Sequence, residues 1–317
     1  MKISETSDQS KGLLAAICSY LIWGILPMYW KSMEEVPAYE ILAQRIVWCF
    51  VFMVLVMVAS SKIKEFYGEC RQILAQPKKL FGLVMASLLI TLNWGTYIWA
   101  VNHDRILETS LGYYINPLIS ILLGIIILKE RLSFWQIISL FLAILGVLNM
   151  ALHFGSVPWI SLILAITFGL YGLFKKVVAL GAITGIALET LLISPFALLY
   201  LGQLHQADQL TFSLAAPNTA MLLMGAGVVT ALPLVLFASG AKSLPLSIIG
   251  FLQYIAPTMA LFLGVFVYQE AFTTVHLISF TFIWTALVIC SLAKTKYFVQ
   301  LETLLLRKFA LKSNKPA

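Results

Sequence analysis

Ten apolar segments, each long enough to cross a bilayer, follow one another along the chain with short polar stretches between them. A helix needs roughly 20 apolar residues to span the hydrocarbon core of a membrane, so each segment predicts one transmembrane helix. The pattern therefore predicts an all-α integral membrane protein with ten transmembrane helices. The expected spans are residues 12–31, 39–59, 80–102, 106–128, 133–152, 157–174, 184–203, 219–240, 246–268 and 273–293.

The composition also indicates that a membrane is the solvent. Hydrophobic residues make up 61% of the 317 residues and charged residues only 11%. A soluble domain carries about a quarter charged residues, so this chain has too much apolar surface for a water-facing globule. The segment before Leu13 is short and polar, and no small-residue cleavage site follows the first apolar run. We therefore expect this run to be a retained span and not a secretory signal.

The distribution of Lys and Arg predicts the orientation. With the N-terminus in the cytosol, the cytosolic segments contain 18 of the 21 Lys and Arg residues, whereas the outer segments contain only Lys31 and Arg105. Cytosolic loops are the positive ones, so both termini are expected in the cytosol. The net charge of +7 then faces anionic lipid, and we expect no nucleic-acid partner. The tail, residues 294–317, mixes apolar with basic residues and predicts an amphipathic helix on the inner surface.

The second half of the chain echoes the first. At an offset of 140 residues, the sequence YINP ending at Pro117 is matched by YIAP ending at Pro257. A glutamate follows each proline thirteen residues later, at Glu130 and Glu270. The repeat unit holds five spans, which is an odd number, so two tandem copies must lie in opposite orientations in the bilayer. Inverted repeats are typical of alternating-access transporters, in which the substrate site lies where the repeats meet.

The first spans of the two halves match more weakly, at an offset of 148 residues. Ser19 and Trp23 are matched by Thr167 and Tyr171. Within each pair the residues are four apart and so share one face of a helix. We therefore expect each half to present one hydroxyl and one aromatic side chain toward the axis between the repeats.

These patterns predict four parts. Residues 1–11 form a cytosolic N-terminus, 12–152 the first five-helix repeat, 153–293 the second, inverted repeat, and 294–317 the cytosolic tail.

The two matched prolines predict hinges. A proline within a helix cannot donate a hydrogen bond to the carbonyl four residues earlier, so Pro117 frees the carbonyl of Tyr113 and Pro257 frees that of Gln253. Freed carbonyls inside a bilayer need a neighbouring helix, water or a ligand as partner. Bending at Pro117 and Pro257 would suit a rocking transporter. The alternative is that the prolines only curve their helices for packing.

Several longer stretches together point to a known family. They are LIWGILPMYWK at residues 21–31, NWGTYIWAVNH at 93–103, SLGYYINPL at 110–118 and QYIAP at 253–257. The combination, which extends over nearly the whole chain, resembles the RarD branch of the EamA-like transporters in the drug/metabolite transporter superfamily. The resemblance implies ten helices in two inverted repeats in the bacterial inner (cytoplasmic) membrane, and export or exchange of small metabolites or drugs. It implies no particular binding residues, and it leaves both a monomer and a homodimer open.

An ionisable residue within a span is costly and marks a functional candidate, and Arg45 and Glu189 are two such residues. Arg45, about seven residues into the second span, is a candidate to bind an anionic group of the substrate. The alternatives are snorkelling to the outer surface or an ion pair with Glu40, Glu189 or another carboxylate. Glu189, in the seventh span, is a candidate for proton uptake that couples transport to the proton gradient. Its alternative is a polar helix-end residue that faces cytosolic water.

The other candidates are aromatic and amide side chains. Aromatic walls with a few hydrogen-bonding groups are typical of small-molecule sites, and the alternative for each residue is packing between helices. The substrate-binding candidates besides Arg45 are Trp23, Asn93, Tyr97, Tyr113, Tyr114, Asn116, Tyr171, Gln253 and Tyr254.

Known catalytic and nucleotide motifs do not occur in the sequence. There is no GxxxxGK[ST], HExxH or GxSxG, and the four cysteines have no metal-ligand spacing, so we expect no enzyme, no cofactor and no metal site. The leading hypothesis is a secondary-active exporter or exchanger of small metabolites or drugs, which works by alternating access around a cavity between the repeats. The alternatives are a passive channel and a membrane receptor or scaffold without coupled transport.

Overall fold

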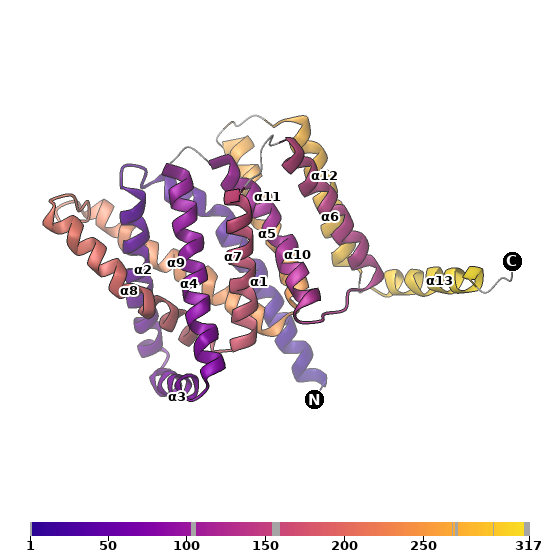
Figure 1. The fold of residues 1–317 in the computed structure, drawn as a ribbon, viewed down its shortest axis with the longest axis horizontal. Coiled ribbons are helices and arrows are strands. Elements are labelled where there is room, and N and C mark those ends of the chain that lie inside the picture. The colour runs from indigo at the N-terminus through magenta and orange to yellow at the C-terminus, as the bar shows by residue number, and fades with distance from the viewer. Residues whose placement is uncertain are drawn as a thin grey trace.

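The computed structural model describes residues 2–102, 106–153, 159–267, 269, 272–293 and 295–313, and these residues form helices and loops without any strand (Figure 1). The predicted all-α fold is thus confirmed. Glu270 and the C-terminal end of the tail lie outside the described residues. In chain order the elements are α1 Lys2–Lys31, α2 Ala38–Ala59, α3 Ile63–Leu74, α4 Pro77–Asn102, α5 Ile106–Ile126, α6 Phe134–His153, α7 Trp159–Val178, α8 Ala182–Gln206, α9 Pro217–Ser243, α10 Leu246–Gln253, α11 Ile255–Phe262, the π-helical turn η1 Leu263–Val267, α12 Thr274–Leu292 and α13 Lys296–Ser313.

Each of the ten predicted spans contains a helix. In the described part of the chain, nine helical segments are long and apolar enough to cross a membrane, and they include α10, α11 and η1 together as Leu246–Val267. The remaining predicted span corresponds to α5, Ile106–Ile126, which contains the apolar stretch Leu111–Ile126.

The matched proline motifs fold differently. α5 runs continuously through Pro117, whereas the ninth predicted span is divided at Tyr254 between α10 and α11, one turn before Pro257. The two segments cross closely, because a Cβ atom on Gly250 would lie 2.7 Å from the Pro117 carbonyl oxygen. Equal sequence motifs therefore give one continuous and one interrupted helix at this crossing.

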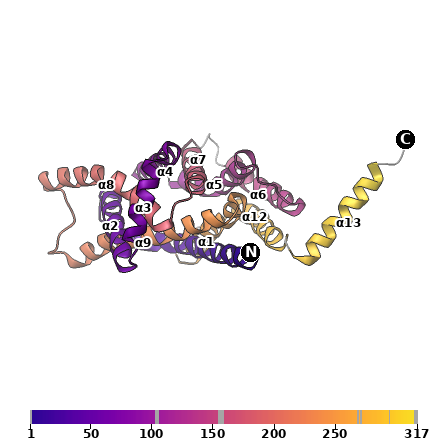
Figure 2. The ribbon, with the colours of Figure 1, turned by 90° about the horizontal axis from the view of Figure 1, so that it is seen from below.

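Helices from the two halves of the chain interleave in two rows (Figure 2). In one row α7 packs between α4 and α5, and in the other α1 packs between α9 and α11. α2 packs against α8 at one end of the rows, and α6 packs against α12 at the other. The centre of the protein is therefore built from both halves.

Two helices lie outside the predicted spans. α3 was not expected, because its twelve residues were assigned to a cytosolic loop; it joins α2 to α4 at one end of the bundle (Figure 1). α13 forms within the tail, where an amphipathic helix was predicted, and projects away from the bundle (Figures 1 and 2). The Trp135 indole N–H anchors its first turn by donating to the Phe298 carbonyl at 2.9 Å. Contact of α13 with a membrane surface stays a prediction.

A glycine sets the closest approach of α2 and α9. A Cβ atom on Gly227 would lie 2.3 Å from the backbone carbon of Trp48 and 2.5 Å from the Cys49 nitrogen. We expect Gly227→Ala to lower the free energy of unfolding by about 1–3 kcal/mol, because two backbones must separate. Gly202→Ala in α8 is the matched control, since no atom lies within 4 Å of its added methyl group. Thermal unfolding in detergent measures both, and equal unfolding temperatures would contradict the close crossing.

Candidate functional site

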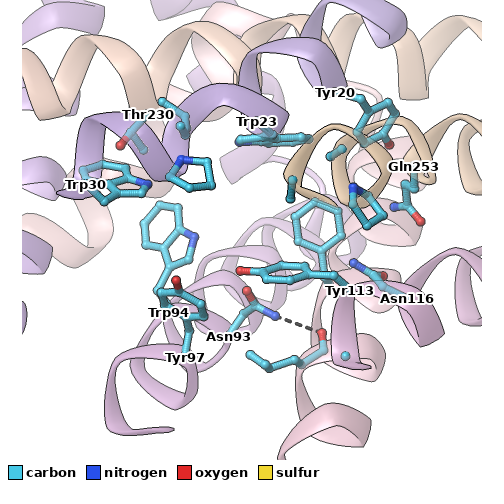
Figure 3. Close-up of a pocket in the computed structure, with 18 of the residues that line it drawn as sticks. Tyr20, Trp23, Trp30, Asn93, Trp94, Tyr97, Tyr113, Asn116, Thr230 and Gln253 are labelled. Atoms are coloured by element: carbon cyan, nitrogen blue, oxygen red, sulfur yellow. Dashed lines mark hydrogen bonds between the residues drawn. The ribbon is translucent and has the colours of Figure 1, made fainter. Parts of the chain in front are cut away.

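A cavity of about 230 Å³ lies between the two rows of helices and takes its walls from both halves of the chain (Figure 3). Drug-sized ligands occupy sites of roughly 300–1,000 Å³, so this cavity suits a smaller molecule. Its walls are mostly aromatic and aliphatic, with a few polar side chains. The lining residues are Tyr20, Trp23, Leu26, Pro27, Trp30, Arg45, Asn93, Trp94, Tyr97, Gly112, Tyr113, Asn116, Leu164, Phe168, Thr230, Leu234, Gln253, Ala256, Pro257 and Ala260.

The structure brings most of the predicted binding residues together at this cavity and leaves three outside its lining. The candidates that line it are Trp23, Arg45, Asn93, Tyr97, Tyr113, Asn116 and Gln253, and the hinge candidate Pro257 joins them. Tyr114, Tyr171 and Tyr254 are buried elsewhere. The sequence analysis did not propose Trp30, Trp94 or Thr230 as binding residues. Thr230 carries a hydroxyl group within an apolar span, and this pattern could have identified it.

Helix geometry explains why neighbouring tyrosines differ. Successive residues of an α-helix point about 100° apart, so Tyr113 and Tyr114 cannot share one face. Tyr113 faces the cavity together with Asn116, one turn later. Tyr114 packs edge-on against Phe280 of α12, with ring centroids 5.3 Å apart. Tyr254, its repeat counterpart, belongs to the same hydrophobic cluster.

Arg45 enters the cavity wall from α2, where aromatic rings surround it. Its guanidinium carbon lies 4.0 Å from the ring centroid of Trp94 and 5.6 Å from that of Trp30, so both indoles are within range of a cation–π interaction. Its Nε is buried and has no hydrogen-bond partner. The predicted alternative of a pair with Glu40 does not form, because both Glu40 oxygens accept backbone N–H groups near Thr211. In the described part of the chain no carboxylate forms an ion pair with Arg45.

Some polar groups of the cavity wall already form hydrogen bonds within the protein, whereas others do not. Asn93 Nδ2 donates to the Leu164 carbonyl and to Thr167 Oγ1, both at 2.9 Å, and so ties α4 to α7 (Figure 3). By contrast, Asn116 Oδ1 and Thr230 Oγ1 are buried and have no hydrogen-bond partner among the residues that the structure describes. Buried polar atoms are nearly always satisfied, so these two indicate positions for water or ligand.

Five aromatic rings separate the cavity from Glu189. We call Tyr20, Trp23, Phe168, Tyr171 and Phe237 the aromatic floor. Trp23 and Phe168 line the cavity with ring centroids 5.7 Å apart, and Tyr171 stacks on Phe237 at 6.0 Å behind them. Trp23 and Tyr171, which match in the sequence, thus each contact both Phe168 and Phe237.

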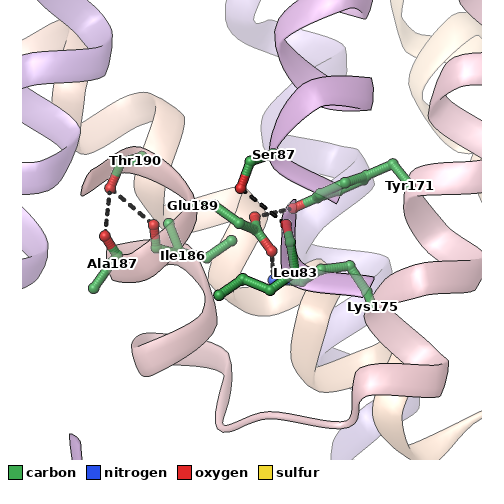
Figure 4. Close-up of polar contacts among 8 residues, drawn as sticks. All are labelled: Leu83, Ser87, Tyr171, Lys175, Ile186, Ala187, Glu189 and Thr190. Carbon is green, nitrogen blue, oxygen red and sulfur yellow. Dashed lines mark hydrogen bonds and ion pairs between the residues drawn. The ribbon is translucent and has the colours of Figure 1, made fainter. Parts of the chain in front are cut away.

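Glu189 forms a buried cluster on the far side of the aromatic floor (Figure 4). Lys175 Nζ lies 2.8 Å from Glu189 Oε1, and the Tyr171 hydroxyl donates to Oε2 at 3.0 Å. The side chains of Lys175 and Glu189 are only 8% and 5% exposed. Glu189 therefore faces neither the cavity, nor Arg45, nor open water. The sequence analysis had counted Lys175 among the loop charges; its burial corrects that assignment.

Glu130 acts at a helix end. Its carboxylate accepts the backbone N–H groups of Leu246 at 2.7 Å and Ser247 at 2.9 Å, at the first turn of α10. A carboxylate there satisfies otherwise unpaired donors and interacts well with the helix dipole. Glu130 thereby links the two halves of the chain, at the end of the bundle that also holds Lys175.

Comparisons with known proteins give a consistent result. The EamA-like transporter family matches residues 10–152. The chain is 46% identical to the uncharacterized transporter YojE of Bacillus subtilis, over 92% of this chain and 97% of that one. It is 42% identical to the protein RarD of Escherichia coli, over 90% and 95% of the two chains. A protein of known crystal structure superposes with a TM-score of 0.69 at 18% identity, over 91% of this chain and 99% of that one, which shows a shared fold.

Proposed function

Because the chain belongs to the RarD branch of the EamA-like transporter family, and is thus a multi-pass transporter of the bacterial inner membrane, we propose that it is a secondary-active exporter or exchanger of small metabolites or drugs. In this proposal it works by alternating access around the cavity. The observation that carries the proposal is the cavity itself, which both halves of the chain build and which the aromatic floor closes on one side.

Equivalent contacts support two inverted repeats, 12–152 and 153–293. Ser19 Oγ donates to the Pro233 carbonyl at 2.8 Å, which ties α1 to α9. Its counterpart Thr167 accepts from Asn93, which ties α7 to α4. In each case the first span of one half is bonded to the third span of the other, as a two-fold axis between inverted repeats requires.

Both termini belong in the cytosol in this proposal. The chain enters α1 and leaves α12 at the lower ends of these helices in Figure 1, which is consistent with termini on one side. The Lys and Arg distribution then selects the cytosolic side. In this orientation the cavity is nearer the outer surface, and the Lys175–Glu189 pair lies toward the cytosol.

The Glu189 cluster supports a role in coupling. Protonation of Glu189 would remove its charge, break the ion pair with Lys175, and weaken the acceptor that holds the Tyr171 hydroxyl. Because Tyr171 belongs to the aromatic floor, a proton taken up at Glu189 would loosen the floor and open the cavity toward the cytosol. The cluster thus joins a titratable group to the closed side of the cavity.

Cysteine labelling tests alternating access. We would place Ala256→Cys, in the cavity wall, on a background with Cys18, Cys49, Cys70 and Cys290 replaced by alanine. A membrane-impermeant maleimide should label this cysteine in right-side-out and in inside-out vesicles, because the cavity opens to each side in turn. The control is the background without the added cysteine. Labelling from one side alone would contradict alternating access, and a gradient-independent ion leak would favour the passive channel.

The hinge hypothesis makes a separate prediction at Pro257. Pro257→Ala restores a hydrogen-bond donor near the break between α10 and α11, so the segment should stiffen. We expect turnover to fall several-fold, with ligand affinity changed less than twofold. Flux and equilibrium binding in the same proteoliposomes measure the two quantities. An equal loss in affinity and turnover would show that Pro257 shapes the cavity wall and does not act as a hinge.

A further inference from the structure

We infer that the substrate is a small organic monoanion: a carboxylate on a flat apolar body, with an uncharged hydrogen-bonding group at its far end. The inference rests on the proposed function, since it takes the cavity as the substrate site. It names the chemistry that this cavity would select.

The charges of the cavity wall limit the charge of a ligand that can bind there. In the described part of the chain, Arg45 is the one charged side chain in the lining, and no carboxylate accompanies it. A buried charge without a partner is costly, and in a membrane protein such charges pair with other groups or with ligands. A cationic ligand would add repulsion, whereas a dianion would keep one charge unpaired. A monoanion alone balances this wall.

The contacts of the Arg45 guanidinium favour a carboxylate as its ligand. Its guanidinium carbon lies 4.0 Å from the Trp94 ring centroid, so the indole covers the guanidinium without accepting its N–H groups in hydrogen bonds to oxygen. In-plane N–H pairs match the two oxygens of a carboxylate. Among the described residues, Nε has no hydrogen-bond partner. The contact with Trp94 and the open Nε therefore suit a carboxylate ligand.

A hydroxyl lies at the same end of the cavity. Figure 3 shows Thr230 beside Trp30, with the ring of Trp94 below them in this view. Its Oγ1 is buried and unpartnered, so it can donate to a carboxylate oxygen that Arg45 leaves free. Arg45 and Thr230 together make the anion end of the cavity.

The rest of the cavity describes the body of the ligand. Trp23 and Tyr113 lie between the anion end and the opposite end, where Asn116 and Gln253 face each other (Figure 3). Flat rings favour a flat apolar group between them. Asn116 has an unpartnered buried oxygen, so an uncharged hydrogen-bonding group of the ligand would satisfy it.

Four probes of one shape test the inference on the full-length protein in nanodiscs. They are 3-phenylpropionate, 3-phenylpropanamide, 3-phenylpropylamine and 3-(4-hydroxyphenyl)propionate. We expect calorimetry to show that the acid binds about tenfold or more tightly than the amide, because charge-assisted bonds are roughly twice as strong as neutral ones. The amine should bind most weakly, and the added hydroxyl should improve binding of the acid.

Variants locate the preference. Arg45→Gln should erase the difference between acid and amide, and Thr230→Val should weaken the acid several-fold. Arg71→Gln is the matched control, because Arg71 is exposed on α3, away from the cavity. Without ligand, Arg45→Gln should unfold at or above the wild-type temperature, since it removes an unpaired charge. A clearly lower unfolding temperature would count against an unpaired Arg45.

Flux in proteoliposomes separates the inference from the proposed function. Transport of the amide or amine, with no preference for the acid, would keep the transporter and overturn the monoanion. Tight binding of the acid without flux of any probe would keep the monoanion and contradict secondary transport. Failure of both acids to bind would also overturn the inference.

Discussion

Arg45→Ala should reduce transport by roughly a factor of ten to a hundred, the equivalent of one charge-assisted contact, while insertion into the membrane stays at the wild-type level. The substitution removes the one charged group in the described cavity lining and leaves Trp30 and Trp94 in place. Counterflow of a labelled carboxylate in proteoliposomes measures the loss.

Two further variants sharpen this result. Arg45→Lys keeps the positive charge but loses the planar fork of N–H donors beside Trp94, so we expect transport between wild type and Arg45→Ala. Arg71→Gln should transport at the wild-type rate. Wild-type flux through Arg45→Ala, at equal protein levels, would place the substrate elsewhere.

Breaking the Lys175–Glu189 pair from one side should destabilise the protein strongly. Removal of one partner leaves the other as a buried unpaired charge, which costs roughly 3–5 kcal/mol. Glu189→Leu should therefore lower the unfolding temperature. The double variant Lys175→Met with Glu189→Leu should recover most of the loss, because apolar side chains of similar volume often replace a buried ion pair without cost. Thermal unfolding in nanodiscs compares the three proteins.

The double variant also separates stability from coupling. If Glu189 carries the coupling proton, the recovered double variant should still bind ligand but no longer respond to a pH gradient across the proteoliposome membrane. A double variant that is stable and still driven by the gradient would assign the pair a structural role alone. Unchanged unfolding of Glu189→Leu would contradict the buried pair itself.

The fold could be predicted from the sequence where a pattern along the chain is enough to specify a helix. Apolar length located the spans, because a bilayer demands it. α3 was missed because it is too short and too polar for a span, and only its amphipathic spacing marks it. The break at Tyr254 was also not predictable. The same motif at Tyr114 belongs to a continuous helix, so neighbouring helices, not the local sequence, decide the outcome.

The candidate site was readable in part. Arg45 and Asn116 stood out as polar groups in apolar helices, and both line the cavity. Which of two adjacent tyrosines faces the cavity depends on helix rotation, which the sequence does not specify. Lys175 looked like a loop charge because it ends an apolar run, and its burial follows from pairing with Glu189 in another helix. Partners brought together by tertiary packing are what sequence reasoning lacked.

The most direct test of the account is untargeted mass spectrometry of cells and medium. Cells would overproduce wild type, Arg45→Ala or Arg71→Gln at verified equal membrane levels. We expect at least one small organic monoanion to shift between cells and medium with wild type and with Arg71→Gln, and not with Arg45→Ala. Identical distributions in all three cultures would contradict transport through the Arg45 cavity.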